Sequence, residues 1–432
     1  METTKKNYAL PIAMMFALFF MIAFVTGLQN PLGLIVKDQF SLDNWGSQLP
    51  TFANFLAYAF LGIPAGLLLQ KVGYKKTALT AIAVGILGVL TMYCSGIVGG
   101  TAMGTFYIYL AGAFISGISM CMLNTVVNPM LNTLGGGGNK GNQLIQFGGS
   151  CNSIAATIAP VLGGYLIANA IGDKSIAAAD PIFYLAIGIF ALAFIVLYMV
   201  NIPEPRLNVV KKDLNDKHSP LSFRHFILGA IAIFIYVGIE VGIPNIANLF
   251  MTSPIEQGGL AIDTTIAGTG VGTYWFLMLV GRLVGALLGA KFSSKSMLIC
   301  VSSLGLIFVT CAMFIPTGTF VSMPVFQSDI SFGMAEVPTA IMFLILCGLC
   351  TSVMWGGIFN LAVEGLGKYT EAGSGIFMVM VCGGGVLPLI QGFVADKTSY
   401  MNSYWVIFAG LLFLLFYALI GSKNVNKNIS VE

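Results

Sequence analysis

The stretch FRHFILGAIAIFIYVGIEVGIPNIANLFM, residues 223–251, carries two formally charged side chains, Arg224 near its start and Glu240 further along. A helix that crosses a lipid bilayer needs about 20 largely apolar residues, so this stretch is long and apolar enough to span one. Eleven further stretches have the same character and lie at 8–36, 46–70, 77–99, 104–133, 142–170, 180–200, 264–290, 296–316, 337–365, 372–394 and 402–421. The sequence therefore predicts an all-α membrane protein with twelve transmembrane helices.

The composition agrees with a chain that is surrounded by lipid. Of the 432 residues, 57% are apolar and 9% are charged, and the mean hydropathy is +0.89. Soluble domains carry roughly 25% charged residues, and disordered chains combine low hydrophobicity with high charge. Both classes are excluded, and the lipid bilayer is the expected surroundings of the protein.

Lysine and arginine residues indicate the orientation of the chain, because cytoplasmic loops carry an excess of them. Sixteen of the twenty lie at the termini or in loops that follow even-numbered spans, three lie in the other loops, and Arg282 lies inside a span. Both termini are therefore expected in the cytoplasm, with the protein in a bacterial inner (cytoplasmic) membrane. The charged segment 201–222 is predicted to be a cytoplasmic linker between two six-helix bundles, residues 1–200 and 223–432.

The two halves repeat each other weakly. The segment Gly66–Lys76 after the second span matches Gly285–Lys295 after the eighth, and Pro160 of the fifth span matches Pro388 of the eleventh. Matches that occur in the same order favour two six-helix repeats. Secondary transporters are built on this plan, with the substrate bound between halves that rock about it. We therefore expect a secondary active transporter that works by alternating access.

Glu240 is the one acidic residue that lies deep inside a predicted span. Fifteen of the seventeen acids lie in loops, termini or span ends, and Glu364 lies near the cytoplasmic end of its span. Ionisable groups inside a membrane are costly and mark ion or substrate paths, so Glu240 is predicted to couple transport to H⁺ or to Na⁺. A structural glutamate bonded to a neighbouring helix is the alternative. Gly238, Gly242 and Pro244 predict a weakened helix at this depth.

Amide and aromatic side chains recur inside the predicted spans. Amides offer both donors and acceptors, which the hydroxyl groups of a sugar need, and an aromatic ring can stack on a pyranose face. The predicted substrate-binding residues are Gln29, Asn30, Asn124, Gln146, Asn152, Asn245, Tyr274, Trp275 and Asn360. The alternative for the amides is hydrogen bonding between helices, and for the aromatic residues it is ordinary packing.

Cationic residues are absent from the interior of the predicted spans apart from Arg282, which lies towards the cytoplasmic end of its span. An anionic substrate usually needs a buried arginine or lysine. The expected substrate is therefore a neutral sugar, which includes monosaccharides, amino sugars and small disaccharides. An exporter of small amphiphilic molecules is an alternative, because the chain has 21 Met and 32 Phe. A membrane sugar sensor that does not transport is an alternative from another class.

The sequence offers no constellation that would carry out covalent chemistry. Its two histidines, His218 and His225, flank a polar loop, and no histidine–cysteine metal motif, phosphate-binding loop or serine–histidine pair is present. The protein is therefore not expected to be an enzyme or to hold a cofactor other than the coupling ion. A nucleic-acid partner is not expected either, and the predicted oligomeric state is a monomer.

The segment Gly66–Lys76, GLLLQKVGYKK, together with twelve spans in two repeats, resembles the major facilitator superfamily. Other segments resemble more narrowly its fucose–galactose–glucose:proton symporter family, and these are residues 63–67, 128–129, 134–135, 152–160, 236–238, 281–282 and 383–396. The similarity extends over nearly the whole chain. It implies the major facilitator fold and the import of a sugar.

The resemblance also bears on single residues. The acids that the family carries in its first and fourth spans fall on Asn30 and Asn124, which do not titrate. The family's asparagine in the fifth span is kept as Asn152, and Glu240 occupies a position that is Glu in glucose/galactose-type members. The resemblance therefore leaves three possibilities: Glu240 carries the proton alone, Na⁺ drives uptake, or the protein is a uniporter.

Overall fold

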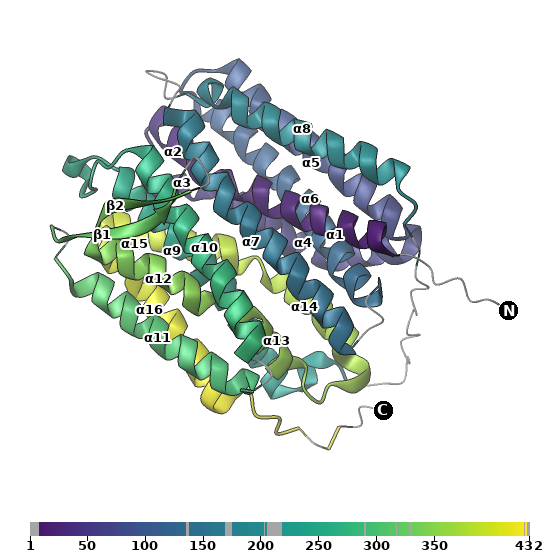
Figure 1. The fold of residues 1–432 in the computed structure, drawn as a ribbon. Helices are drawn as coiled ribbons and strands as arrows, with labels where there is room; N and C mark the ends of the chain where they lie inside the picture. The colour runs from purple at the N-terminus through teal and green to yellow at the C-terminus, as the bar shows by residue number, and fades with distance from the viewer. Residues whose placement is uncertain are drawn as a thin grey trace.

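Long helices lie side by side in two groups that follow the order of the chain (Figure 1). The computed structural model describes residues 8–134, 138–168, 175–202, 204, 218–288, 291–316, 318–327, 331–426 and 428–429. The N-terminal group consists of α1 (Ala9–Gly27), α2 (Gln29–Gln39), α3 (Asn44–Ser47), α4 (Leu49–Val72), α5 (Tyr74–Val98), α6 (Met103–Leu134), α7 (Gly138–Ala168), the 3₁₀-helix η1 (Ile176–Ala179) and α8 (Asp180–Met199).

The C-terminal group follows the same course but contains more breaks. It consists of η2 (Pro220–Ser222), α9 (Arg224–Thr252), η3 (Ile255–Gln257), α10 (Thr264–Leu288), α11 (Ser294–Phe314), β1 (Phe320–Phe326), β2 (Phe332–Pro338), α12 (Thr339–Thr351), α13 (Met354–Val363), η4 (Gly367–Tyr369), α14 (Thr370–Met380), α15 (Gly383–Lys397), α16 (Tyr400–Phe416) and the π-helix η5 (Tyr417–Gly421).

The helices have the length and character of membrane spans. Among the described residues, eleven helical segments are long and apolar enough to cross a membrane. Helix α10, with 25 residues, occupies the predicted eighth span and completes twelve passages. Large apolar side chains face outwards, as at Met199 and Leu287, which are 79% and 77% exposed. A contiguous apolar surface of this kind indicates contact with lipid. The predicted helical membrane fold is confirmed.

A two-stranded antiparallel hairpin, β1 with β2, lies between α11 and α12. The sequence pattern assigns no role to this segment, so the hairpin is an addition to the predicted fold. Its strands pair Phe326 with Phe332 next to the turn. The backbone N–H of Phe326 donates to the hydroxyl of Thr273 on α10 at 2.9 Å, and the rings of Phe276 and Phe326 stack with their centroids 6.1 Å apart. These contacts attach the hairpin to α10.

In the part of the chain that the structure describes, three passages are broken near their middle. The first is interrupted at Leu28, between α1 and α2, three residues before Pro31. The tenth is interrupted between α12 and α13, and the eleventh between α14 and α15. Breaks at membrane depth are tolerated where they are buried in protein or line a cavity.

The seventh passage is continuous, in contrast to the weakened helix that its sequence predicts. Helix α9 runs through Pro244 without a break. Its glycines instead allow close packing on α15, because a Cβ on Gly238 would lie 2.5 Å from the Cβ of Leu387. Small residues have this role at helix contacts in membranes. The glycines therefore bring α9 and α15 together and do not mark a hinge in α9.

The two groups of helices meet along two seams. Helix α7 packs against α10, and α4 packs against α14 and α15. In the first seam, a Cβ on Gly268 would lie 2.8 Å from the carbonyl oxygen of Pro160, and one on Gly164 would lie 2.9 Å from that of Thr264. The backbones of α7 and α10 therefore touch directly. We call the end of the bundle that carries α3, and at which α4, α10 and α16 begin, the α3 end.

The start of the predicted linker is attached to the N-terminal group. Glu204 accepts hydrogen bonds from the backbone N–H groups of Tyr74 and Lys75, at 2.7 and 3.0 Å, where α5 begins. The ammonium group of Lys75 donates to the carbonyl oxygens of Tyr198 and Val200 at the end of α8. The repeated basic segment after α4 thus holds the last turn of α8. Residues 203 and 205–217 of the linker lie outside the described residues.

The glycine seam gives a direct test of the helix packing. Gly268→Ala should lower the midpoint of thermal unfolding of the detergent-solubilised protein, because its Cβ would collide with the backbone of α7 at a cost of about 1–3 kcal/mol. Gly188→Ala in α8 is the matched control, because a Cβ at that position meets no atom within 4 Å. The control should leave the midpoint unchanged or raise it slightly, since alanine favours helix. Equal midpoints for both variants would contradict the close seam.

Candidate functional site

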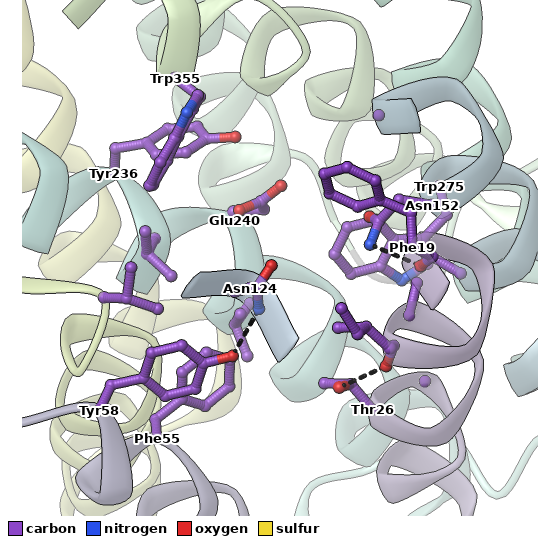
Figure 2. A pocket seen from close by; sticks show the side chains of 18 of the residues that line it. Phe19, Thr26, Phe55, Tyr58, Asn124, Asn152, Tyr236, Glu240, Trp275 and Trp355 are labelled. Atoms are coloured by element: carbon purple, nitrogen blue, oxygen red, sulfur yellow. Dashed lines mark hydrogen bonds between the residues drawn. The ribbon is translucent and has the colours of Figure 1, made fainter. Parts of the chain in front are cut away.

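A cavity of about 280 Å³ lies between the two groups of helices (Figure 2). Its lining comes from α1, α2, α4, α6 and α7 on one side and from α9, α10, α13 and α14 on the other. This volume is close to the lower end of the range of small-molecule sites, roughly 300–1,000 Å³. The polar residues of the lining are Thr26, Gln29, Thr51, Tyr58, Asn124, Asn128, Asn152, Tyr236, Glu240, Asn245, Arg282 and Ser352.

Three asparagines of the N-terminal group line the cavity, and the NH₂ group of each side-chain amide already donates a hydrogen bond within the protein. The Nδ2 atom of Asn124 donates to the Tyr58 hydroxyl at 2.8 Å, that of Asn128 to the carbonyl oxygen of Asn124 at 3.0 Å, and that of Asn152 to the carbonyl oxygen of Phe19 at 3.3 Å. Among the described residues, the three Oδ1 atoms have no donor. They are therefore acceptors available to the hydroxyl groups of a ligand.

Glu240 is paired with a cation, the guanidinium group of Arg282 on the neighbouring helix α10. An oxygen of Glu240 lies 3.7 Å from Nη2 of Arg282, and the side chains are 14% and 17% exposed. The other guanidinium nitrogen, Nη1, donates to the carbonyl oxygen of Gly149 at 2.7 Å and to the hydroxyl of Ser153 at 2.9 Å. Arg282 thus joins α9 of its own group to α7 of the other group, and the cavity keeps no net charge from this pair.

The antiparallel course of α9 and α10 explains how the pair forms. Glu240 lies twelve residues before the end of α9, and Arg282 lies eighteen residues after the start of α10. At 1.5 Å per residue the two Cα atoms differ in depth by ~9 Å, a distance that the two side chains together bridge. An arginine inside a span needs a partner, and this rule could have identified Glu240 as the partner from the sequence.

Tyr274 supports the backbone at Glu240 and does not line the cavity, in contrast to its predicted stacking role. Because Pro244 has no N–H, the carbonyl oxygen of Glu240 loses its helical partner. The hydroxyl of Tyr274 donates to this oxygen at 3.1 Å and also lies 3.1 Å from the hydroxyl of Thr351. Tyr274 thus satisfies the acceptor that the proline leaves free, which keeps α9 continuous beside the cavity.

Aromatic rings labelled in Figure 2 line the cavity from both groups of helices, Phe55 and Tyr58 from the N-terminal group and Tyr236, Trp275 and Trp355 from the C-terminal group. The rings of Tyr236 and Trp355 lie 6.2 Å apart, and those of Phe55 and Tyr58 lie 6.0 Å apart. Flat apolar faces next to amide and hydroxyl groups suit a ligand that is apolar on its faces and polar at its edges.

The structure brings together six of the ten residues predicted for the site. The cavity lining contains Gln29, Asn124, Asn152, Asn245, Trp275 and Glu240. It does not contain Tyr274 or Asn360, and the Asn360 side chain is exposed at the end of α13, where Nδ2 lies 3.5 Å from the hydroxyl of Ser294. The side chains of Asn30 and Gln146 lie outside the described residues. Arg282, Tyr58 and Tyr236 also line the cavity, and none of these three is among the residues that the sequence predicts for the site.

A buried lysine closes the bundle at its α3 end, although the sequence places it in a loop. The ammonium group of Lys37 on α2 donates to Oδ1 of Asn44 at 2.7 Å, to the hydroxyl of Ser253 at 3.0 Å and to that of Tyr400 at 3.4 Å. Ser253 and Tyr400 belong to the C-terminal group. The carboxylate of Asp396 adds bonds to the backbone N–H groups at the start of α3. We call Lys37, Asn44, Ser253, Tyr400 and Asp396 the latch.

Between the latch and the cavity, two amides join the groups directly. Nδ2 of Asn245 on α9 donates to Oε1 of Gln48, which precedes α4, at 3.1 Å, and both side chains are buried. Gln48 in turn donates to the hydroxyl of Ser47 at 3.3 Å, and that hydroxyl donates to the backbone carbonyl of Asn44. Hydrogen bonds therefore run from the latch to the cavity lining, and the cavity is closed off from the α3 end.

The comparison with known families agrees with this arrangement, because the model of the Major Facilitator Superfamily matches residues 14–387. The chain belongs to this superfamily. It is 29% identical to the glucose/galactose transporter of Brucella abortus over 98% of this chain and 96% of the relative. It is 22% identical to the L-fucose-proton symporter of Escherichia coli over 91% of this chain and 89% of the relative.

Solved structures of the superfamily share the fold. The crystal structure of the Escherichia coli fucose:proton symporter superimposes with a TM-score of 0.68 at 19% identity, covering 97% of this chain and 100% of the symporter chain. The predicted resemblance to the superfamily and its fucose permease-like members is therefore confirmed. Members of this superfamily are transporters, so the expectation that the protein is not an enzyme is confirmed as well.

If the latch holds the α3 end closed, loss of the Lys37 ammonium group should let this end open more often. Lys37→Met removes hydrogen bonds from a charged donor, which should weaken closure of the α3 end by about 1–3 kcal/mol. The measurement is the pulsed-EPR distance between spin labels at Trp45 and Asn402 in a variant without native cysteines. We expect a larger fraction of molecules in which the two labels are far apart, as in an open α3 end. Lys397→Met removes the same charge from an exposed position at the same end and should leave the distances unchanged; the same effect in both variants would contradict the latch.

Proposed function

We propose that the protein is a secondary active transporter that imports a neutral sugar by alternating access. The observation that carries this proposal is the cavity itself, which lies between the two groups of helices and is closed off at the α3 end. Free amide oxygens, aromatic faces and a charge-neutral ion pair match the polar edge and apolar faces of a pyranose. The relatives named as glucose/galactose and L-fucose transporters support the same substrate class.

The charge distribution supports one orientation of the bundle. Most lysine and arginine residues belong to the end opposite α3, and cytoplasmic loops are the ones enriched in these residues. In our proposal the α3 end faces the outside, both termini face the cytoplasm, and the protein lies in the inner membrane of a bacterium as a monomer. Closure at the α3 end then corresponds to a state that is shut to the outside.

In this proposal the two groups of helices act as domains, residues 1–200 and 223–432, that rock about the cavity. Motion at the outer end requires the seams α7–α10 and α4–α15 to separate there, together with the latch. The linker 201–222 joins the domains on the cytoplasmic side. Glu204 and Lys75 fix the first part of the linker to the start of α5 and the end of α8. A movement of the linker is therefore passed on to the basic segment after α4.

Coupling is assigned to Glu240 with Arg282. A proton on Glu240 neutralises its charge and removes the attraction for Arg282, whereas Na⁺ would compete with the guanidinium for the same carboxylate. Either ion changes the partner of Arg282, which also binds Gly149 and Ser153 on α7. Because Arg282 touches both domains, the occupancy of Glu240 acts on the contact between them. No other cofactor is needed.

A substrate panel tests the proposed function. Proteoliposomes containing the protein should take up at least one of D-glucose, D-galactose, L-fucose, N-acetylglucosamine and lactose, because the cavity offers acceptors and aromatic faces on both sides. Uptake of the labelled sugar should be concentrative under an inward H⁺ or Na⁺ gradient, applied separately. Absence of both uptake and a thermal shift with every member of the panel would rule out the sugar assignment, and outward pumping of amphiphilic dyes would favour an exporter.

Neutralising the buried acid tests the coupling assignment. Glu240→Gln should abolish accumulation of the sugar against its gradient, because the side chain can no longer bind the coupling ion. Arg282 is left without its counter-charge in this variant, so Glu240→Gln with Arg282→Gln should exchange sugar faster than Glu240→Gln alone. Glu364→Gln makes the same change at an exposed acid outside the cavity and should accumulate sugar as the wild type does. Undiminished accumulation by Glu240→Gln would show that coupling lies elsewhere.

A further inference from the structure

A small polar chamber lies between the latch and the cavity. Its volume is about 10 Å³, and its polar lining consists of Gln29, Ser47, Gln48, Thr51, Asn245 and Asn248. Three of these residues, Gln29, Thr51 and Asn245, also line the main cavity, so the two spaces adjoin. A space of this size holds about one water molecule and is far too small for a sugar.

The polarity of this chamber is not explained by closure alone. A plug that only excludes water could be apolar, because buried polar groups cost free energy unless they are hydrogen-bonded. Asn248 is 4% exposed, and its Oδ1 atom has no hydrogen-bond partner among the described residues. The amides of Gln48 and Asn245 bind each other across the domain boundary. One acceptor is thus unused, and two further groups are paired only while the α3 end is closed.

The boundary between the domains passes through the middle of the chamber. Gln29, Ser47, Gln48 and Thr51 belong to the N-terminal domain, whereas Asn245 and Asn248 belong to α9 of the C-terminal domain. When the α3 end opens, these two sets separate and the bond between Gln48 and Asn245 breaks. The four amide groups of Gln29, Gln48, Asn245 and Asn248 then face a space that is open to the outside and connected to the cavity.

We propose that this chamber is an outer sugar subsite that exists in the outward-open state and is collapsed here. The inference rests on the proposed function. In the open state the sugar hydroxyls take the places that the protein groups fill on closure: one donates to Oδ1 of Asn248, and others bind the amides of Gln48 and Asn245. Closure restores the bond between Gln48 and Asn245 and shrinks the space below the size of a sugar. The sugar is thereby displaced into the main cavity, which retains its own acceptors.

A subsite that binds sugar only from the outside should affect the apparent affinity for sugar on that side of the membrane and not on the other. Asn248→Leu is the primary variant, because Asn248 Oδ1 has no bond to lose in the closed state. Initial uptake of labelled D-galactose and D-glucose is measured in right-side-out and in inside-out membrane vesicles as a function of sugar concentration. We expect KM from the outside to rise about tenfold, which is the effect of one hydrogen bond. KM from the inside should stay as in the wild type. Asn402→Leu, the same change at an exposed site of the α3 end, is the control.

Each other outcome overturns the proposal. Equal increases of KM from the outside and from the inside would place Asn248 in the main site. A higher KM from the outside with a lower KM from the inside would mean that the variant only shifts the protein towards the closed state. Unchanged KM values on both sides would mean that the chamber holds water only. Gln48→Leu is the second variant: the subsite predicts a higher outside KM, whereas loss of a purely structural bond would favour the open state and lower it. A wild type that transports neither sugar nor any other member of the panel would instead refute the proposed function.

Discussion

A charged group inside a membrane-spanning bundle needs a partner, and the pairing of Glu240 with Arg282 meets this requirement at the centre of the protein. Arg282 also donates to Gly149 and Ser153 on α7, so the same side chain that compensates the acid connects the two groups of helices. Pro244 adds a second requirement, because it frees the carbonyl oxygen of Glu240, which the Tyr274 hydroxyl satisfies. The position of the cavity follows from these contacts between α7, α9 and α10.

Closure at the α3 end combines two kinds of contact with different properties. Glycines in the α7–α10 seam let backbones touch and define how near the two groups of helices can come. The latch around Lys37 and the amide pair of Gln48 and Asn245 are hydrogen bonds that can be exchanged for bonds to water or to a ligand. Close packing sets the geometry of the closed state, and exchangeable polar contacts keep it reversible, as alternating access requires.

The fold could be predicted because hydrocarbon forces each spanning segment to satisfy its own backbone hydrogen bonds, which leaves a strong signature in every apolar stretch. The hairpin β1–β2 lies outside that constraint, and its contact with α10 joins residues distant in the chain, so no local signal predicted it. For the site, Glu240 and the amides Asn124 and Asn152 could be found because polar groups are rare in spans. Asn360 follows the same rule but lies outside the cavity, since periodicity does not say which neighbour a helix face meets.

By itself, the sequence determined the apolar spans and the presence of one deep acid, because these depend on composition along single segments. Only the tertiary structure decided that Arg282 reaches Glu240, that Lys37 is buried in a latch, and that Gln48 and Asn245 face each other. Each of these contacts joins residues distant in the chain, and its existence depends on the relative depth and rotation of packed helices. Those quantities are set by the packing of the whole bundle and have no counterpart in the local sequence pattern.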